Sequence, residues 1–174
     1  MFTEHTLESA PQAARKALET VSANLGHLPE AVSAVARLAE SPELLTGFLH
    51  VSGAFERGTL EPVAREVVIM TIAVRNDCHV CVVMHTGKLR ALGADEHLTA
   101  ALCEQRPLPD ERLEGVRQFT LAVVAAGGAV SDDELRRFLT LGYTKRNALE
   151  VVLGIGAYTM STYANRLTGA GLGD

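Results

Sequence analysis

Two cysteines, a histidine and a glutamate occur at spacings that allow thiol chemistry. The sequence places Glu66 eleven residues before Cys78, Cys78 three residues before Cys81, and Cys81 four residues before His85. Residues three or four apart on a helix share one face, so the two thiols and the imidazole are expected to be neighbours. Thiols on one face can form a disulfide, and a neighbouring imidazole can accept a thiol proton.

The start of the cysteine-bearing helix bears on the reactivity of the thiols. Asp77 is a good N-cap, which predicts a helix from Cys78 to Leu92 with Cys78 in its first turn. The free amides and the dipole at a helix start stabilise a thiolate and lower the pKa of a cysteine. On this argument Cys78 is the more acidic thiol.

Glu66 is predicted to reach the imidazole from the preceding helix. If the helices before and after the break at residues 76–77 pack antiparallel, residue 66 falls opposite residue 87, about 3 Å of helix rise from His85. Glu66 can then hold or charge-balance the imidazole. The alternatives are a zinc site made by the two cysteines, His85 and Glu66, and a Glu66 that faces solvent.

The rest of the chain predicts an all-α fold, because helical periodicity occurs throughout and strand alternation does not. Ser9 is expected to cap the first helix, Gly58 to end the third in a left-handed conformation, and Gly93 to stop the helix after the cysteines. Gly154 and Gly156 are expected to let a neighbouring helix come close. The predicted helices cover about residues 9–26, 29–38, 41–58, 61–75, 78–92, 95–104, 111–126, a stretch that opens with the capping box at 131–134, and 144–167.

Length and composition indicate one domain over residues 1–174, with helices of 1–58 packed on a cysteine-bearing core of 59–104 and a C-terminal lobe of 108–174. The formal charge of −5 argues against nucleic-acid binding. The start of the chain lacks signal-peptide character, and no apolar run approaches a membrane span, so a cytoplasmic location is expected. Cys103 is expected to be a small core residue, and His79 to be exposed beside the pair.

The stretch from Leu60 through the cysteine pair to Gly93 resembles the alkylhydroperoxidase AhpD-like, or carboxymuconolactone decarboxylase, family. The resemblance continues upstream in the segments 24–29 and 41–45, and downstream in 142–144 and 149–153, which are similar to single-domain peroxidase-related members. It implies an AhpD-like helical bundle that assembles as a homotrimer or homohexamer.

The resemblance also implies a reaction, the reduction of hydrogen peroxide or organic hydroperoxides by a thiol-dependent oxidoreductase. Cys81 would attack the peroxide, Cys78 would resolve the sulfenic acid to a disulfide, and Glu66 and His85 would relay the proton. No bound cofactor or metal is implied, and an external dithiol, such as a lipoyl-bearing protein, would reduce the disulfide. The dipole favours Cys78 as nucleophile, but His85 lies one turn from Cys81, and a positioned base is the more selective influence.

One residue departs from the pattern of the lipoyl-dependent branch, which tends to carry a histidine directly before the second cysteine. This chain has Val80 there, and a histidine one position earlier. Two alternatives from other functional classes stay open: a redox sensor that cycles its disulfide without catalysis, and a metal-binding or ligand-binding helical oligomer.

Overall fold

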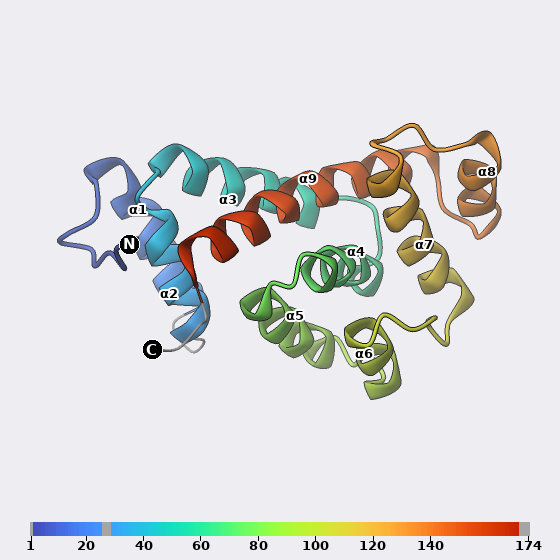
Figure 1. Cartoon of the computed structure of the whole chain (residues 1–174), viewed down its shortest axis with the longest axis horizontal. Helices are drawn as coiled ribbons and strands as arrows, with labels where there is room; N and C mark the ends of the chain where they lie inside the picture. The colour runs from blue at the N-terminus through green and yellow to red at the C-terminus, as the bar shows by residue number, and fades with distance from the viewer. Residues whose placement is uncertain (1, 26–28, 171–174) are drawn as a thin grey trace.

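The computed structural model describes residues 2–25 and 29–170, and within those ranges all regular structure is helical (Figure 1). The prediction of an all-α fold is confirmed. The predicted end of the first helix at Gly26 lies outside the described residues. The helices are α1 (Gln12–Leu25), α2 (Pro29–Leu38), α3 (Pro42–Glu56), α4 (Pro62–Arg75), α5 (His79–Ala91), α6 (Glu96–Cys103), α7 (Glu111–Ala125), α8 (Asp132–Thr140) and α9 (Lys145–Thr168).

Helix α4 is the centre of the structure. It packs against α9, α5, α7 and α6, and Figure 1 shows it between the long α9 and the shorter α5. Its apolar run from Val67 to Ala73 is buried almost completely, as expected for a helix that is covered on most sides. Any polar side chain on α4 that faces α5 therefore lies in the interior.

Sequence signals locate most helix boundaries correctly, but the cap assignments of Ser9 and Gly58 are wrong. The Ser131–Glu134 capping box forms as predicted, and Ser41 caps the helix predicted over about 41–58. The first helix begins at Gln12, because the Ser9 hydroxyl accepts a hydrogen bond from the Thr6 amide in the turn before it. Gly58 does not have a positive φ, although Gly93 does.

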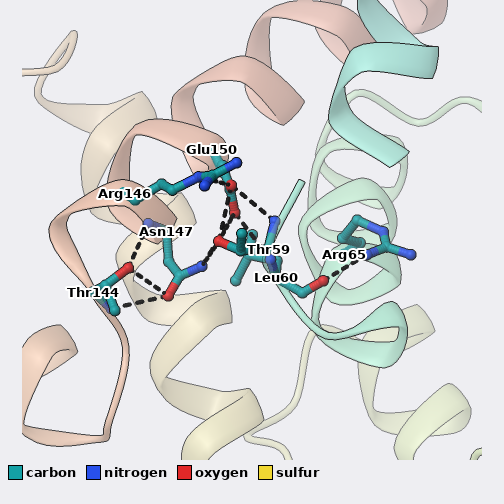
Figure 2. A network of polar contacts seen from close by, with 7 residues as sticks. All are labelled: Thr59, Leu60, Arg65, Thr144, Arg146, Asn147 and Glu150. Atoms are coloured by element: carbon teal, nitrogen blue, oxygen red, sulfur yellow. Dashed lines mark hydrogen bonds and ion pairs between the residues drawn. The ribbon is translucent and has the colours of Figure 1, made fainter. Parts of the chain in front are cut away.

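Gly58 instead makes room for the buried Glu150 carboxylate. This carboxylate joins α9 to the α3–α4 loop (Figure 2). A Cβ at Gly58 would lie 3.1 Å from the Glu150 Cδ. The Glu150 carboxylate accepts hydrogen bonds from the Thr59 amide and hydroxyl, the Leu60 amide and the Asn147 side chain. Burial opposes ionisation of Glu150, but these donors outweigh it and hold the pKa of the carboxyl below its ordinary value. The network fixes the start of α4 against α9.

The two glycines of α9 differ in their surroundings. A Cβ at Gly154 would lie 2.7 Å from the Phe55 Cζ and 3.0 Å from the Val68 Cγ1, so α3 and α4 approach α9 closely there, as predicted. A Cβ at Gly156 would meet no described atom within 4 Å. The expectation that Gly156 also admits a neighbouring helix is therefore wrong within the described chain, since this residue is exposed.

No helix in the described ranges combines the length and apolar content needed to cross a membrane.

The two glycines provide a matched pair for testing the packing of α9. Gly154→Ala is expected to lower the free energy of unfolding by about 1–3 kcal/mol, because the added methyl overpacks the core against Phe55. Gly156→Ala is expected to raise it by up to about 1 kcal/mol through helix propensity alone. Urea unfolding followed by circular dichroism measures both changes, and equal stabilities for the two variants would contradict the close approach at Gly154.

Candidate active site

The cysteine-bearing helix begins at a tight turn that both α4 and α5 share. The amides of Asp77 and Cys78 donate to the carbonyls of Val74 and Ala73, and Asp77 has a φ of 52°. This is a Schellman ending of α4. Cys78 is therefore the N-cap residue of α5, and the prediction of Asp77 as N-cap is wrong by one residue, because Asp77 supplies the left-handed conformation that ends α4.

The two thiols are buried and close together. Cys78 is 2% exposed and Cys81 is 3% exposed, and their Sγ atoms lie 3.0 Å apart, within hydrogen-bond distance. Both are free thiols. The Asn165 side chain on α9 donates from Nδ2 to the Cys81 Sγ at 3.4 Å and to the Cys78 Sγ at 3.8 Å.

The surroundings give the two thiols different acidities. The Cys81 thiol donates to a Cys78 thiolate, which together with the Cys81 amide, Asn165 and the charge of Arg166 outweighs burial and lowers the pKa of Cys78 to about 6. The same contact, reinforced by burial, raises the pKa of Cys81. The reduced pair thus holds one negative charge near neutral pH, and that charge resides on Cys78.

A buried carboxylate and imidazole lie on the facing sides of α4 and α5. The Glu66 Oε2 lies 2.6 Å from the His85 Nδ1, and these residues are 2% and 7% exposed. The antiparallel packing of the two helices produces this contact, as the sequence predicts. The half-exposed Lys88 on the next turn of α5 places its Nζ 3.2 Å from the Glu66 Oε1 and 2.7 Å from the Glu56 Oε1.

The Glu66 carboxylate stays ionised although it is buried. Burial raises its pKa, but the hydrogen bond and charge of His85 and the charge of Lys88 outweigh burial, so the pKa of Glu66 lies below its ordinary value. The Tyr158 ring meets the His85 ring edge-on, with centroids 5.3 Å apart. The imidazole is therefore held between a carboxylate and an aromatic edge.

The contact between imidazole and thiol differs from the sequence expectation. In the described chain the hydrogen-bond partner of His85 is Glu66, while the partners of the sulfurs are each other and Asn165. The group within hydrogen-bond distance of the Cys81 Sγ on α5 is thus the Cys78 Sγ rather than the His85 imidazole. Among residues 2–25 and 29–170, no three metal-ligating side chains converge as a metal site requires, so the alternative zinc site has no donor set in this arrangement.

Two further cysteine and histidine predictions have different outcomes. His79 is exposed beside the pair, as predicted. Cys103 is also exposed, so its placement in the core is wrong. Helix α6 turns Leu98, Ala101 and Leu102 inward, and Cys103 ends the helix on the opposite side.

The main element that the sequence reasoning did not connect to the site is the C-terminal half of α9. Tyr158, Thr162, Asn165 and Thr168 are buried there, and the Asn76 side chain donates to the Thr162 hydroxyl at 2.9 Å. Polar residues at this i, i+4, i+7 spacing form one helical face. A buried polar face was therefore visible in the sequence, although nothing in the spacing shows that it meets the cysteines.

Comparison with known proteins places the cysteine pair in a family segment. Residues 39–106 match the model of the carboxymuconolactone decarboxylase family, and this range includes Glu66, both cysteines of the pair and His85. A search of curated proteins found no match.

Solved structures share the fold over almost the whole chain. A protein from Ralstonia eutropha JMP134, described as an alkylhydroperoxidase AhpD core and an uncharacterized peroxidase-related protein, superposes with a TM-score of 0.82 at 20% identity, covering 97% of this chain and 90% of the other. An uncharacterized peroxidase-related protein from Silicibacter sp. TM1040 has a TM-score of 0.77 at 19% identity, with coverages of 97% and 88%. A protein of unknown function from Agrobacterium tumefaciens, whose description suggests an AhpD antioxidant defence protein, has a TM-score of 0.60 at 18% identity, with coverages of 75% and 90%. The chain therefore contains a segment that matches the carboxymuconolactone decarboxylase family, and it shares its fold with these AhpD-like structures.

Proposed function

We propose that this protein is a thiol-dependent peroxidase that reduces hydrogen peroxide or organic hydroperoxides through a Cys78–Cys81 disulfide. The observation that carries the proposal is the pair of buried thiols 3.0 Å apart with one stabilised thiolate. A thiolate is the nucleophilic form of cysteine, and a second thiol within reach converts a sulfenic acid into a disulfide. The names of the two structural neighbours described as peroxidase-related support the same reaction class.

The first step is the oxidation of one sulfur. The Cys81 thiol passes its proton to the Cys78 thiolate, 3.0 Å away, and the resulting Cys81 thiolate attacks the terminal oxygen of the hydroperoxide. The O–O bond breaks, an S–O bond forms, and the alkoxide leaves with a proton. In the second step the Cys78 sulfur displaces water from the Cys81 sulfenic acid, and the disulfide forms. The sulfur pair loses two electrons and the peroxide gains them.

Glu66 and His85 supply the proton that the alkoxide takes. Glu66 accepts a hydrogen bond from the His85 Nδ1, which fixes the tautomer and leaves Nε2 free to donate when the imidazole is charged. The buried carboxylate lies 2.6 Å from the imidazole, and His85 and Lys88 together keep it ionised. An alkoxide is a poor leaving group without such a general acid.

The disulfide returns to the dithiol by exchange with an external dithiol, which takes up the two oxidising equivalents. We propose a dithiol-bearing protein, such as one carrying a lipoyl group, as this reductant. We also propose that the working form is a homotrimer or homohexamer.

Single-cysteine variants test the roles of the two sulfurs. Cys81→Ser is expected to abolish peroxide consumption with a dithiol reductant, because the attacking sulfur is gone. Cys78→Ser is expected to lose turnover and to form a sulfenic acid on Cys81 only slowly, since this variant lacks both the resolving thiol and the thiolate that accepts the Cys81 proton. Dimedone trapping followed by peptide mass mapping locates the sulfenic acid.

The exposed Cys103 provides the matched control, and Cys103→Ser should leave turnover unchanged. A sulfenic acid on Cys78 in the Cys81→Ser variant would assign the attack to the other sulfur. Wild-type protein that forms the disulfide with peroxide but does not turn over with any dithiol would be a redox sensor.

The pH dependence of peroxide consumption reports the charge on the pair. The pKa of Cys78 is lowered to about 6, so the thiolate is lost as the pH falls below that value. The single-turnover rate with excess hydrogen peroxide is expected to fall about tenfold from pH 7.5 to pH 5 and to change little above pH 7.5. A midpoint near the ordinary thiol value, about 8.5, would show that the thiolate is not stabilised.

Glu66→Gln tests the proton relay. Removing the carboxylate is expected to slow peroxide consumption by about 10²-fold or more, because the imidazolium loses its counter-charge. Glu56→Gln is the matched control, since Glu56 also pairs with Lys88 but does not contact His85. Stopped-flow peroxide assays compare the variants, and equal losses in both would remove Glu66 from the relay.

A further inference from the structure

Asn165 is a buried polar side chain that the predicted set of two cysteines, histidine and glutamate does not use. It is 4% exposed. Its Nδ2 contacts both sulfurs, at 3.4 and 3.8 Å, while its Oδ1 is buried without a hydrogen-bond partner in the described chain. An unsatisfied buried carbonyl typically costs about 1–3 kcal/mol. An unpaired buried group of this kind needs an explanation, and one explanation is that a reactant binds to it during the reaction.

The backbone around Asn165 holds this amide against the sulfurs. One turn earlier on α9, Thr162 accepts a hydrogen bond from the Asn76 side chain. On the next residue, Arg166 binds the carbonyl and the carboxylate of Asp77. Asn76 and Asp77 belong to the turn that positions Cys78. These hydrogen bonds therefore hold α9 against the start of α5 both before and after Asn165 in the sequence.

The two ends of the amide suit different partners in the peroxide reaction. A thiolate accepts hydrogen bonds, and the Nδ2 donor meets that need at whichever sulfur carries the charge. The oxidant of the proposed reaction carries an O–H donor on the oxygen that the sulfur attacks. The Oδ1 acceptor lies on the same planar group as Nδ2 and has no hydrogen-bond partner in the described chain, so it can accept from such a donor.

We propose that Asn165 is a further catalytic residue, which donates from Nδ2 to the reacting thiolate and accepts at Oδ1 the hydrogen bond of the hydroperoxide O–H. This inference rests on the proposed function. As the Cys81 sulfur attacks the terminal oxygen, the S–O bond forms and the O–O bond breaks. Asn165 keeps the O–H proton on the oxygen that becomes the sulfenic acid, while the departing alkoxide takes its proton from His85. The amide itself neither gains nor loses a proton.

Two variants separate the donor from the acceptor. Asn165→Ala removes both, whereas Asn165→Asp keeps an acceptor oxygen, removes the donor and is nearly the same size. The first readout needs no peroxide, because the pH dependence of thiol alkylation by iodoacetamide gives the midpoint of thiolate formation. Asn165→Ala is expected to raise this midpoint by about one pH unit, since a hydrogen bond to a charged group is lost. Asn165→Asp is expected to raise it further, because it also places a second negative charge beside the sulfurs.

The second readout is the ratio of the hydrogen peroxide rate to the iodoacetamide rate, measured at pH 9, where the thiolate is largely formed. Asn165→Ala is expected to lower this ratio about tenfold, the effect of one lost hydrogen bond in the transition state. Asn165→Asp is expected to lower it less. A role confined to packing would move neither the midpoint nor the ratio.

Tyr163→Phe is the matched control, because Tyr163 lies on the same helix, 57% exposed, and both readouts should stay at the wild-type values. Thermal unfolding checks that each variant folds, and the near-isosteric Asn165→Asp keeps the test open if Asn165→Ala does not. An unchanged midpoint in Asn165→Asp or an unchanged ratio in a folded Asn165→Ala would overturn the inference. Wild-type protein that alkylates with a low midpoint yet does not react with peroxide would overturn the proposed function instead.

Discussion

The contact between Glu66 and His85 is the constraint around which the site is organised. It places a charge inside α4, the most buried helix of the structure, where an unpaired carboxylate would be very unfavourable. The imidazole and Lys88 satisfy that charge from α5. The rotational setting of α5 against α4 is thereby fixed, and with it the face on which the two thiols lie.

The thiol pair and the carboxylate–imidazole pair are separate units in the reduced protein. The sulfurs share their hydrogen bond with each other and with Asn165, whereas His85 bonds to Glu66. This separation suits a reaction with two proton movements. One occurs between the sulfurs when the nucleophile forms, and the other delivers a proton to the departing oxygen.

The sequence was sufficient to predict what depends on spacing within one helix or between consecutive helices. The all-α class, the shared face of Cys78 and Cys81, and the reach of Glu66 to His85 all follow from helix geometry. Contacts from distant parts of the chain could not be derived that way. Asn165 lies 84 residues after Cys81 in the sequence. Gly58 and Glu150, which are in contact, are separated by a similar number of residues. The cap assignment of Asp77 failed because one short turn serves two helices: Asp77 ends α4, and Cys78 both completes that ending and caps α5.

The shared turn between α4 and α5 has a consequence for how this family segment can vary. The Cys78 amide ends one helix while the Cys78 carbonyl begins the next, so no spare residue separates them. Inserting or deleting one residue here would change the path from α4 into α5, and with it the face that α5 turns toward α4. Both sulfurs would then lose their contact with Asn165, and the imidazole would lose its contact with the Glu66 carboxylate. The length of this turn is therefore more tightly constrained than the identity of its exposed residues.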